Sequence, residues 1–96
     1  MLFGSDSPLS DGDLLGRFVQ ERDEGSFAVL VRRHGPMVFG VCHRVLRHEQ
    51  DAEDAFQATF LVLVRRATSI QSPGTIAGWL HGVAQRTALE ARGTSP

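Results

Sequence analysis

The sequence predicts an all-α domain, and three observations support this. Apolar residues recur at helical spacing in four segments, and no segment shows the alternating pattern of a half-buried strand. Residues typical of helix N-caps precede two of these segments. The chain has 96 residues, which suits a single domain. We therefore expect a compact helical bundle of about four helices at residues 11–93, after a loose tail at residues 1–10.

The first helix is expected at residues 11–21. Ser10 and Asp13 have the spacing of a capping box, with Asp in place of the usual Glu or Gln. The second helix is expected at residues 24–47. Gly35-Pro36 interrupts its pattern, and because proline removes a backbone donor we expect a kink or break near His34.

The third helix is expected at residues 52–67, with Asp51 as its N-cap. Arg65 and Arg66 would lie in its last turns, where the helix dipole favours positive charge. Leu61 and its apolar neighbours fall outside the inward stripe. This helix is therefore predicted to be central to the bundle or covered by a partner.

A loop is expected at residues 68–75, where Ser, Thr and a Pro-Gly pair cluster. The fourth helix follows at residues 76–92 with Gly93 as a C-cap, and residues 94–96 form the end of the chain. The helical spacing predicts the following core: Leu14, Phe18, Phe27, Leu30, Val31, Val38, Val41, Phe56, Phe60, Leu63, Trp79, Leu80 and Val83.

Composition limits the possible functions. The formal net charge is -1, so any affinity for DNA alone should be weak. Cys42 is the single cysteine and is expected in the core. The start of the chain has no signal-peptide pattern, and its longest apolar run is too short to span a membrane, so a cytoplasmic location is expected.

Catalytic and cofactor motifs are missing from the sequence. We find no phosphate-binding loop, dinucleotide fingerprint or nucleophile elbow. The four histidines lack the spacing of a helical metal site, and we expect them on the surface. The sequence therefore predicts a protein that is not an enzyme and uses no metal or cofactor.

The most informative segment is residues 51–63. Helical spacing places Asp54, Gln57 and Leu61 on one stripe and Phe56, Phe60 and Leu63 on another. The first stripe could dock on a basic helical partner, or it could be an ordinary solvated face. Residue patterning alone leaves both interpretations open.

Three segments resemble the extracytoplasmic-function group of the sigma-70 family. Asp51-Ala52-Glu53-Asp54, followed by Gln57 and Phe60, is similar to region 2.2 of these factors. Residues 27–38 are similar to their region 2.1, and Trp79-Leu80 resembles the start of their region 2.4 helix. The resemblance covers residues 11–92 and implies an all-helical region 2 domain.

The resemblance also implies partners. In that family the region 2.2 helix docks on the clamp helices of the RNA polymerase β′ subunit, and the following loop and helix recognise and melt the promoter −10 element on its non-template strand. An anti-sigma factor would be a further partner. The matching positions for polymerase are Asp51, Glu53, Asp54, Gln57 and Leu61. Those for DNA are Ser69, Gln71, Ser72, Gln85, Arg86 and Arg92, with Trp79 as a core anchor that shapes the loop.

The sequence differs from the family pattern at several points. Ala58 stands where many members have Glu, and Arg86 stands where many have Asn. A second domain that reads the −35 element is expected after region 2 but is absent from these 96 residues. Two alternatives follow: a helical module that binds polymerase as a regulator without initiating transcription, and a free-standing helix-turn-helix protein that binds DNA.

Overall fold

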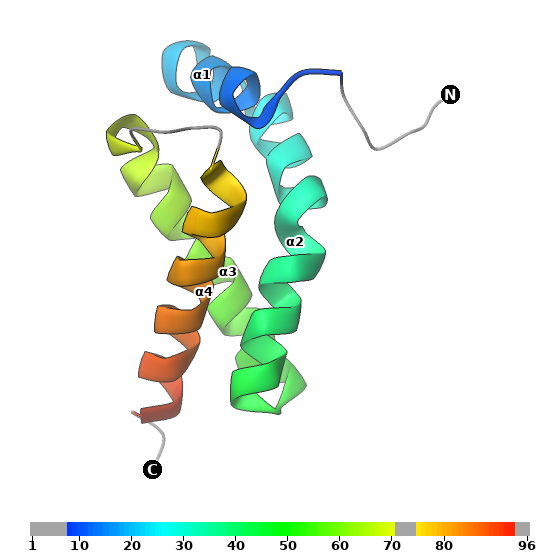
Figure 1. The fold of residues 1–96 in the computed structure, drawn as a ribbon, viewed down its shortest axis with the longest axis vertical. Helices are drawn as coiled ribbons and strands as arrows, with labels where there is room; N and C mark the ends of the chain where they lie inside the picture. Colours follow the sequence, from blue (N-terminus) through cyan, green and yellow to red (C-terminus); the bar gives the residue numbers. More distant parts are fainter. Residues whose placement is uncertain (1–7, 71–74, 94–96) are drawn as a thin grey trace.

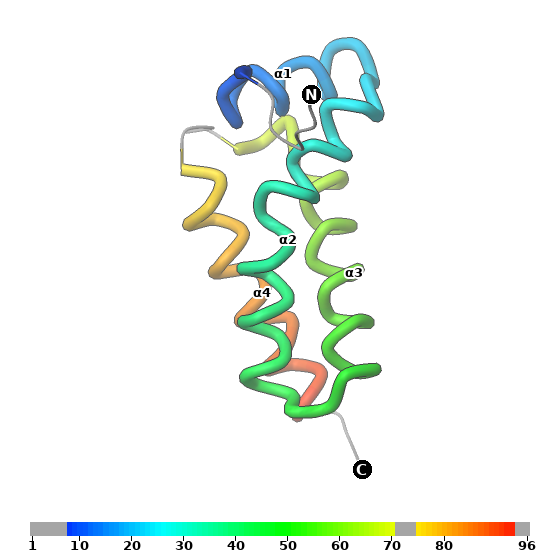
Figure 2. The backbone as a smooth tube through the Cα atoms, turned by 90° about the vertical axis from the view of Figure 1, so that its right-hand side faces the viewer, coloured from blue at the N-terminus to red at the C-terminus, as the bar shows by residue number. Residues whose placement is uncertain are grey.

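A computed structural model describes residues 8–70 and 75–93 and confirms the all-α prediction. These residues form α1 (Asp11–Glu21), α2 (Glu24–Leu46), α3 (Glu49–Arg66), the 3-10 helix η1 (Ala67–Ser69) and α4 (Ile76–Gly93), without a strand. The long helices α2, α3 and α4 lie side by side and alternate in direction (Figure 1). α1 crosses the end of this bundle where α2 and α4 begin and α3 ends, as Figure 2 shows from the side.

Side chains cap the first two helices. The Ser10 hydroxyl accepts a hydrogen bond from the Asp13 backbone N–H at 3.0 Å, and the Asp13 carboxylate accepts one from the Ser10 N–H at 3.4 Å. This confirms the predicted capping box. Asp23 caps α2 by accepting hydrogen bonds from the Gly25 N–H and the Ser26 hydroxyl. The hydrogen bond from Ser26 is the main cause of the lowered pKa of Asp23.

A kink or a break was expected near His34, and the break is wrong. α2 continues through Gly35-Pro36 as one helix of 23 residues. Leu30 and Val38, on either side of this pair, are fully buried in the same core, and their packing holds the two halves of the helix in register. Pro36 has no backbone N–H, so the Arg32 carbonyl loses its helical hydrogen-bond donor. Because Pro36 is exposed, this carbonyl lies on the side of α2 nearer to water.

The start of the third helix also differs from the prediction. α3 begins at Glu49, and its N-cap is His48, which makes no side-chain capping hydrogen bond. Asp51 therefore lies in the first turn, where its charge complements the helix dipole. Arg47 ends α2 in the left-handed conformation, and only Arg47 and His48 separate the two helices. At the far end, α4 includes Gly93, which was expected to follow it.

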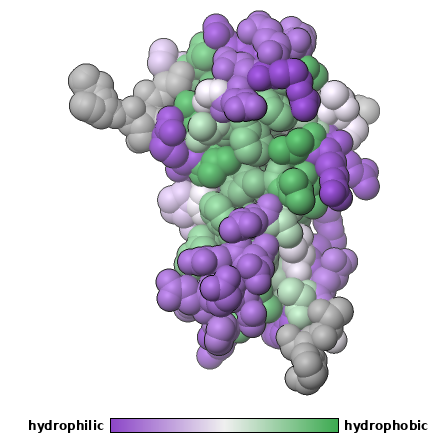
Figure 3. Space-filling model, turned by 180° about the vertical axis from the view of Figure 1, so that it is seen from behind, coloured by the Kyte–Doolittle hydropathy of each residue, from purple (hydrophilic) through white to green (hydrophobic). Residues whose placement is uncertain are grey.

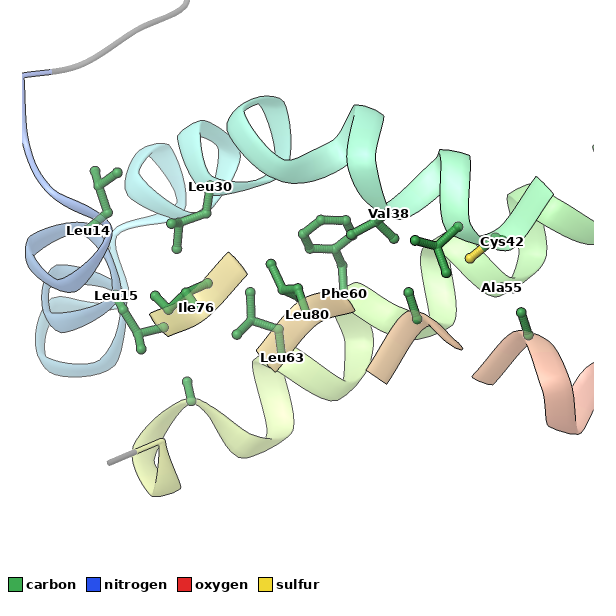
Figure 4. Packing of buried hydrophobic residues seen from close by; sticks show 14 of the residues in the cluster. Leu14, Leu15, Leu30, Val38, Cys42, Ala55, Phe60, Leu63, Ile76 and Leu80 are labelled. Carbon is green, nitrogen blue, oxygen red and sulfur yellow. The ribbon is translucent and has the colours of Figure 1, made fainter. Parts of the chain in front are cut away.

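The core lies between all four helices (Figure 4). Cys42 is buried in it, as predicted, and burial raises the pKa of its thiol while a hydrogen bond with Thr59 opposes that shift. The core prediction is wrong for four side chains, which pack against the core but keep part of their surface exposed; these are Phe27, Val31, Phe56 and Trp79. Among the described residues, no helix has the length and apolar character needed to cross a membrane.

Candidate docking groove and nucleic-acid face

A groove with a mainly apolar lining runs between α2 and α3. Its volume is about 500 Å³. Val31, Gly35 and Phe39 line it from α2, and Phe56 and Gln57 line it from α3. A second, smaller hollow of about 230 Å³ continues along the same two helices and shares several of these residues. Figure 3 shows this apolar surface in the middle of the face opposite to that of Figure 1.

Phenylalanine rings form the floor of this α2–α3 groove. The Phe56 ring lies 6.3 Å from the Phe39 ring and 5.1 Å from the Phe60 ring, measured between centroids. A Cβ atom at Gly35 would lie 3.4 Å from Phe56 Cε1, which is ordinary van der Waals contact, so the Phe56 ring packs directly against α2 at this position. The partial exposure of Phe56 and Val31 is therefore a property of the groove, where the sequence predicted core.

The five predicted polymerase-binding residues are all exposed on α3, but the structure divides them. Glu53 and Gln57 line the groove, and Leu61, with 52% of its surface exposed, lines its continuation. Asp51 and Asp54 line a separate hollow beside Leu46, Ala55 and Ala91, near the end of α4. The outer face of α3 thus has an apolar flank on the α2 side and an acidic flank near the end of α4.

Sequence patterning missed four groove residues on α2, namely Arg32, Gly35, Pro36 and Phe39. Phe39 was the signal in the sequence that could have revealed this side of α2. It lies outside the stripe formed by Val38, Val41 and Cys42, and so it gives α2 a second apolar side. Arg32 and Glu53, which carry opposite charges, are polar residues on the two helices that line the groove. A partner with an apolar centre and polar margins would match this arrangement.

The predicted DNA-contacting residues lie along a different part of the molecule. Ser69 is exposed in η1, where its hydroxyl donates a hydrogen bond to the Arg66 carbonyl at 2.9 Å. Gln85, Arg86 and Arg92 are exposed on α4, and Arg92 is in its last turn. Arg92 lies seven positions after Gln85, so the two residues share one side of α4. Arg86, one position after Gln85, points about 100° away from Gln85 around the helix axis. Gln71 and Ser72 lie outside the described residues.

Trp79 occupies the first turns of α4 and is partly buried against the core. The neighbouring Ile76 and Leu80 are fully buried and fix this end of the helix. The position of Trp79 agrees with an anchor for the start of α4. Its influence on the preceding loop stays a prediction.

The prediction that every histidine is on the surface is wrong for His34. His43, His48 and His81 are exposed, whereas His34 is buried and its Nε2 lies 2.9 Å from Asp11 Oδ2. Burial raises the pKa of Asp11, but hydrogen bonds and charges from Arg33 and His34 outweigh burial and leave that pKa lowered. In the part of the chain that the structure describes, no cluster of acidic, histidine or cysteine side chains could hold a metal ion.

Comparison with known proteins identifies the family. Residues 30–94 match the model of the family described as Sigma-70 region 2. This chain belongs to the sigma-70 region 2 family. The region 2 match includes most of α2 and all of α3 and α4, and so it covers both the groove and the predicted nucleic-acid face.

The relatives place this region 2 domain in the extracytoplasmic-function group. The chain is 37% identical over 65 residues to the ECF RNA polymerase sigma factor SigE of Mycolicibacterium smegmatis, covering 68% of the chain and 25% of the relative. It is 37% identical over 82 residues to the ECF RNA polymerase sigma factor SigK of Mycobacterium sp. strain KMS, covering 84% of the chain and 42% of the relative. It is 38% identical over 69 residues to the RNA polymerase sigma factor CarQ of Myxococcus xanthus, covering 71% of the chain and 39% of the relative.

The chain thus spans less than half the length of each of these relatives. No solved structure gave a significant match.

Proposed function

We propose that this chain acts as the region 2 domain of a sigma factor, binding core RNA polymerase and contacting the promoter −10 element. The observation that carries the proposal is the α2–α3 groove, whose apolar floor lies open beside Glu53, Gln57 and Leu61. These three residues belong to the segment that resembles region 2.2, which docks on the β′ clamp helices in the family. The family match supports the same partner.

The division of the α3 surface suggests how docking would proceed. Asp51 and Asp54 are exposed, so their charges act over a longer range than the apolar groove does. Exposed carboxylates would steer a basic helical partner toward α3, and burial of the groove would then supply most of the affinity. Docking would leave η1 and the exposed side of α4 available for DNA.

Contact with DNA should depend on polymerase. The net charge is -1, and the three predicted DNA-binding residues on α4 supply only two arginines. So few arginine contacts give weak, salt-sensitive affinity. Polymerase would supply the remaining affinity by holding α4 beside the non-template strand. The effective concentration of the strand at α4 would then be high.

Charge reversal at Asp54 tests the docking surface. The Asp54→Arg variant places positive charge against a basic partner, and we expect affinity for purified core polymerase to fall at least about tenfold in a direct titration. The matched control is Glu21→Arg, which makes the same charge change at an exposed site on α1 and should bind like the unaltered chain. Equal affinities for the two variants would remove the docking assignment.

A second experiment tests the contact with DNA. A randomised pool of single-stranded DNA is offered to the chain with and without core polymerase, and to the Arg86→Ala variant. We expect retention of the pool only with polymerase, and less retention by the variant. Equal retention in the presence and absence of polymerase would contradict the proposal. Polymerase binding without any retention of DNA would favour the regulator that does not initiate transcription.

A further inference from the structure

Asp11 joins the first two helices through both of its carboxylate oxygens. Oδ1 accepts a hydrogen bond from Arg33 Nη1 at 2.9 Å, and Oδ2 lies 2.9 Å from His34 Nε2. Arg33 and His34 are consecutive residues of α2, and more than twenty positions separate them from Asp11 in the chain. We call this arrangement of Asp11, Arg33 and His34 the Asp11 clasp.

The clasp is sheltered from solvent. The side chain of His34 keeps 10% of its surface exposed, that of Asp11 keeps 20% and that of Arg33 keeps 22%. An ion pair at this depth is less screened than one on the open surface, and its fixed geometry orients the two helices as well as attracting them. Asp11 also lies in the first turn of α1, directly after the N-cap Ser10 and within the capping box that Ser10 forms with Asp13, so its backbone position is itself fixed.

α1 in turn touches the element that precedes the predicted DNA-binding loop. α1 packs against both α2 and η1, and Ala67 of η1 is buried in the same apolar cluster as Leu14 and Leu15 of α1. Leu15 and Ile76, the first residue of α4, point toward each other in Figure 4. The position of α1 therefore influences both described elements that flank residues 71–74.

We propose that the Asp11 clasp is a positioning device: by fixing α1 on α2, it sets the placement of η1 and the first turn of α4 for contact with promoter DNA. The inference rests on the proposed function for its biological meaning, but its structural content concerns this chain alone. Asp11 touches no predicted DNA- or polymerase-binding residue through the clasp, so it acts through the helices that it joins.

Hydrogen exchange on the intact chain tests the clasp directly. Asp11→Asn keeps the shape of the side chain and removes its charge. We expect amide exchange in η1 and the first turn of α4 to accelerate about tenfold, with no change in the centres of α2 and α3. The matched control, Glu21→Gln, removes one negative charge from an exposed site on the same helix and should leave exchange unaltered. Arg33→Gln, which removes one partner of Asp11, should give the same regional pattern.

The pattern of exchange decides the outcome. Acceleration confined to η1 and the start of α4 supports the inference, as does a change in the fluorescence of Trp79, the single tryptophan of the chain. Uniform acceleration in all helices would show that Asp11 only stabilises the fold, and no acceleration would show that the clasp is dispensable. Either result overturns the inference.

The same variants separate this inference from the proposed function. With core polymerase, Asp11→Asn should bind like the unaltered chain, because the α3 surface is unchanged, but it should retain less of the single-stranded DNA pool. If the unaltered chain fails to bind polymerase, the proposed function is wrong, and the exchange experiment still decides whether the clasp positions η1. If Asp11→Asn weakens both kinds of binding equally, the positioning role is wrong.

Discussion

The two faces of α3 have almost opposite character. On the inner face, Ala52, Thr59 and Leu63 are completely buried. On the outer face, Asp54 and Gln57 are exposed, and Leu61 has 52% of its surface open to solvent. Both faces carry large apolar side chains, and among the described residues only the inner face is covered by the rest of the chain.

This difference separates the forces that fold the domain from those that would bind a partner. Closely packed side chains on the inner face lose contacts and leave a cavity when they are shortened. Exposed side chains on the outer face have few contacts to lose within the chain. Substitutions on the two faces should therefore affect different measurements, and neighbouring positions in the sequence allow a direct comparison.

The largest effect is expected at Phe60. This side chain keeps only 6% of its surface exposed and contacts the rings of Phe27 and Phe56. Phe60→Ala should reduce the free energy of unfolding by about 3–5 kcal/mol, a large share of the stability of a small domain. Urea denaturation followed by circular dichroism measures this loss. A loss below about 1 kcal/mol would show that the inner face is loosely packed.

The neighbouring Leu61 should behave in the opposite way. Leu61→Ala is expected to change the free energy of unfolding by no more than about 0.5 kcal/mol, because half of the side chain is already exposed. It should weaken binding to core polymerase by about fivefold, equivalent to about 1 kcal/mol. Denaturation and titration of one protein sample check both values. A stability loss as large as that of Phe60→Ala would remove the distinction between the faces.

The sequence predicted this distinction for most of α3. Helical spacing correctly assigned Phe60 and Leu63 to the core and placed Asp54, Gln57 and Leu61 on an exposed stripe. It did not predict that α2 would leave Phe56 partly open. That outcome depends on how closely the two helices approach each other, which a pattern along one helix does not contain.

The remaining differences also arise from contacts distant in sequence. Proline at position 36 favours a break locally, but burial on both sides of it keeps α2 continuous. His34 resembles any surface histidine until α1 brings Asp11 against it. The family resemblance, in contrast, depends on short local patterns in α2, α3 and α4, and for that reason it could be recognised without a structure.

The smallest effect, and the most sensitive test of the inner face, is expected for a valine substitution at Thr59. Its hydroxyl is completely buried and donates a hydrogen bond to the Ala55 carbonyl at 2.8 Å. That carbonyl is positioned to accept the helical N–H of Thr59 as well, so Thr59→Val leaves no unpaired group on the backbone, although it also removes the hydrogen bond with the Cys42 thiol.

We expect Thr59→Val to change the free energy of unfolding by less than about 0.5 kcal/mol, because a buried methyl group takes the place of the hydroxyl. Thr59→Ser keeps the hydroxyl and removes a methyl group from the core, which should cost about 1 kcal/mol. Urea denaturation shows which of the two variants has the larger free energy of unfolding. If the valine variant is the less stable of the two, the hydrogen bond outweighs packing at this position, and the inner face of α3 is held by more than apolar contact.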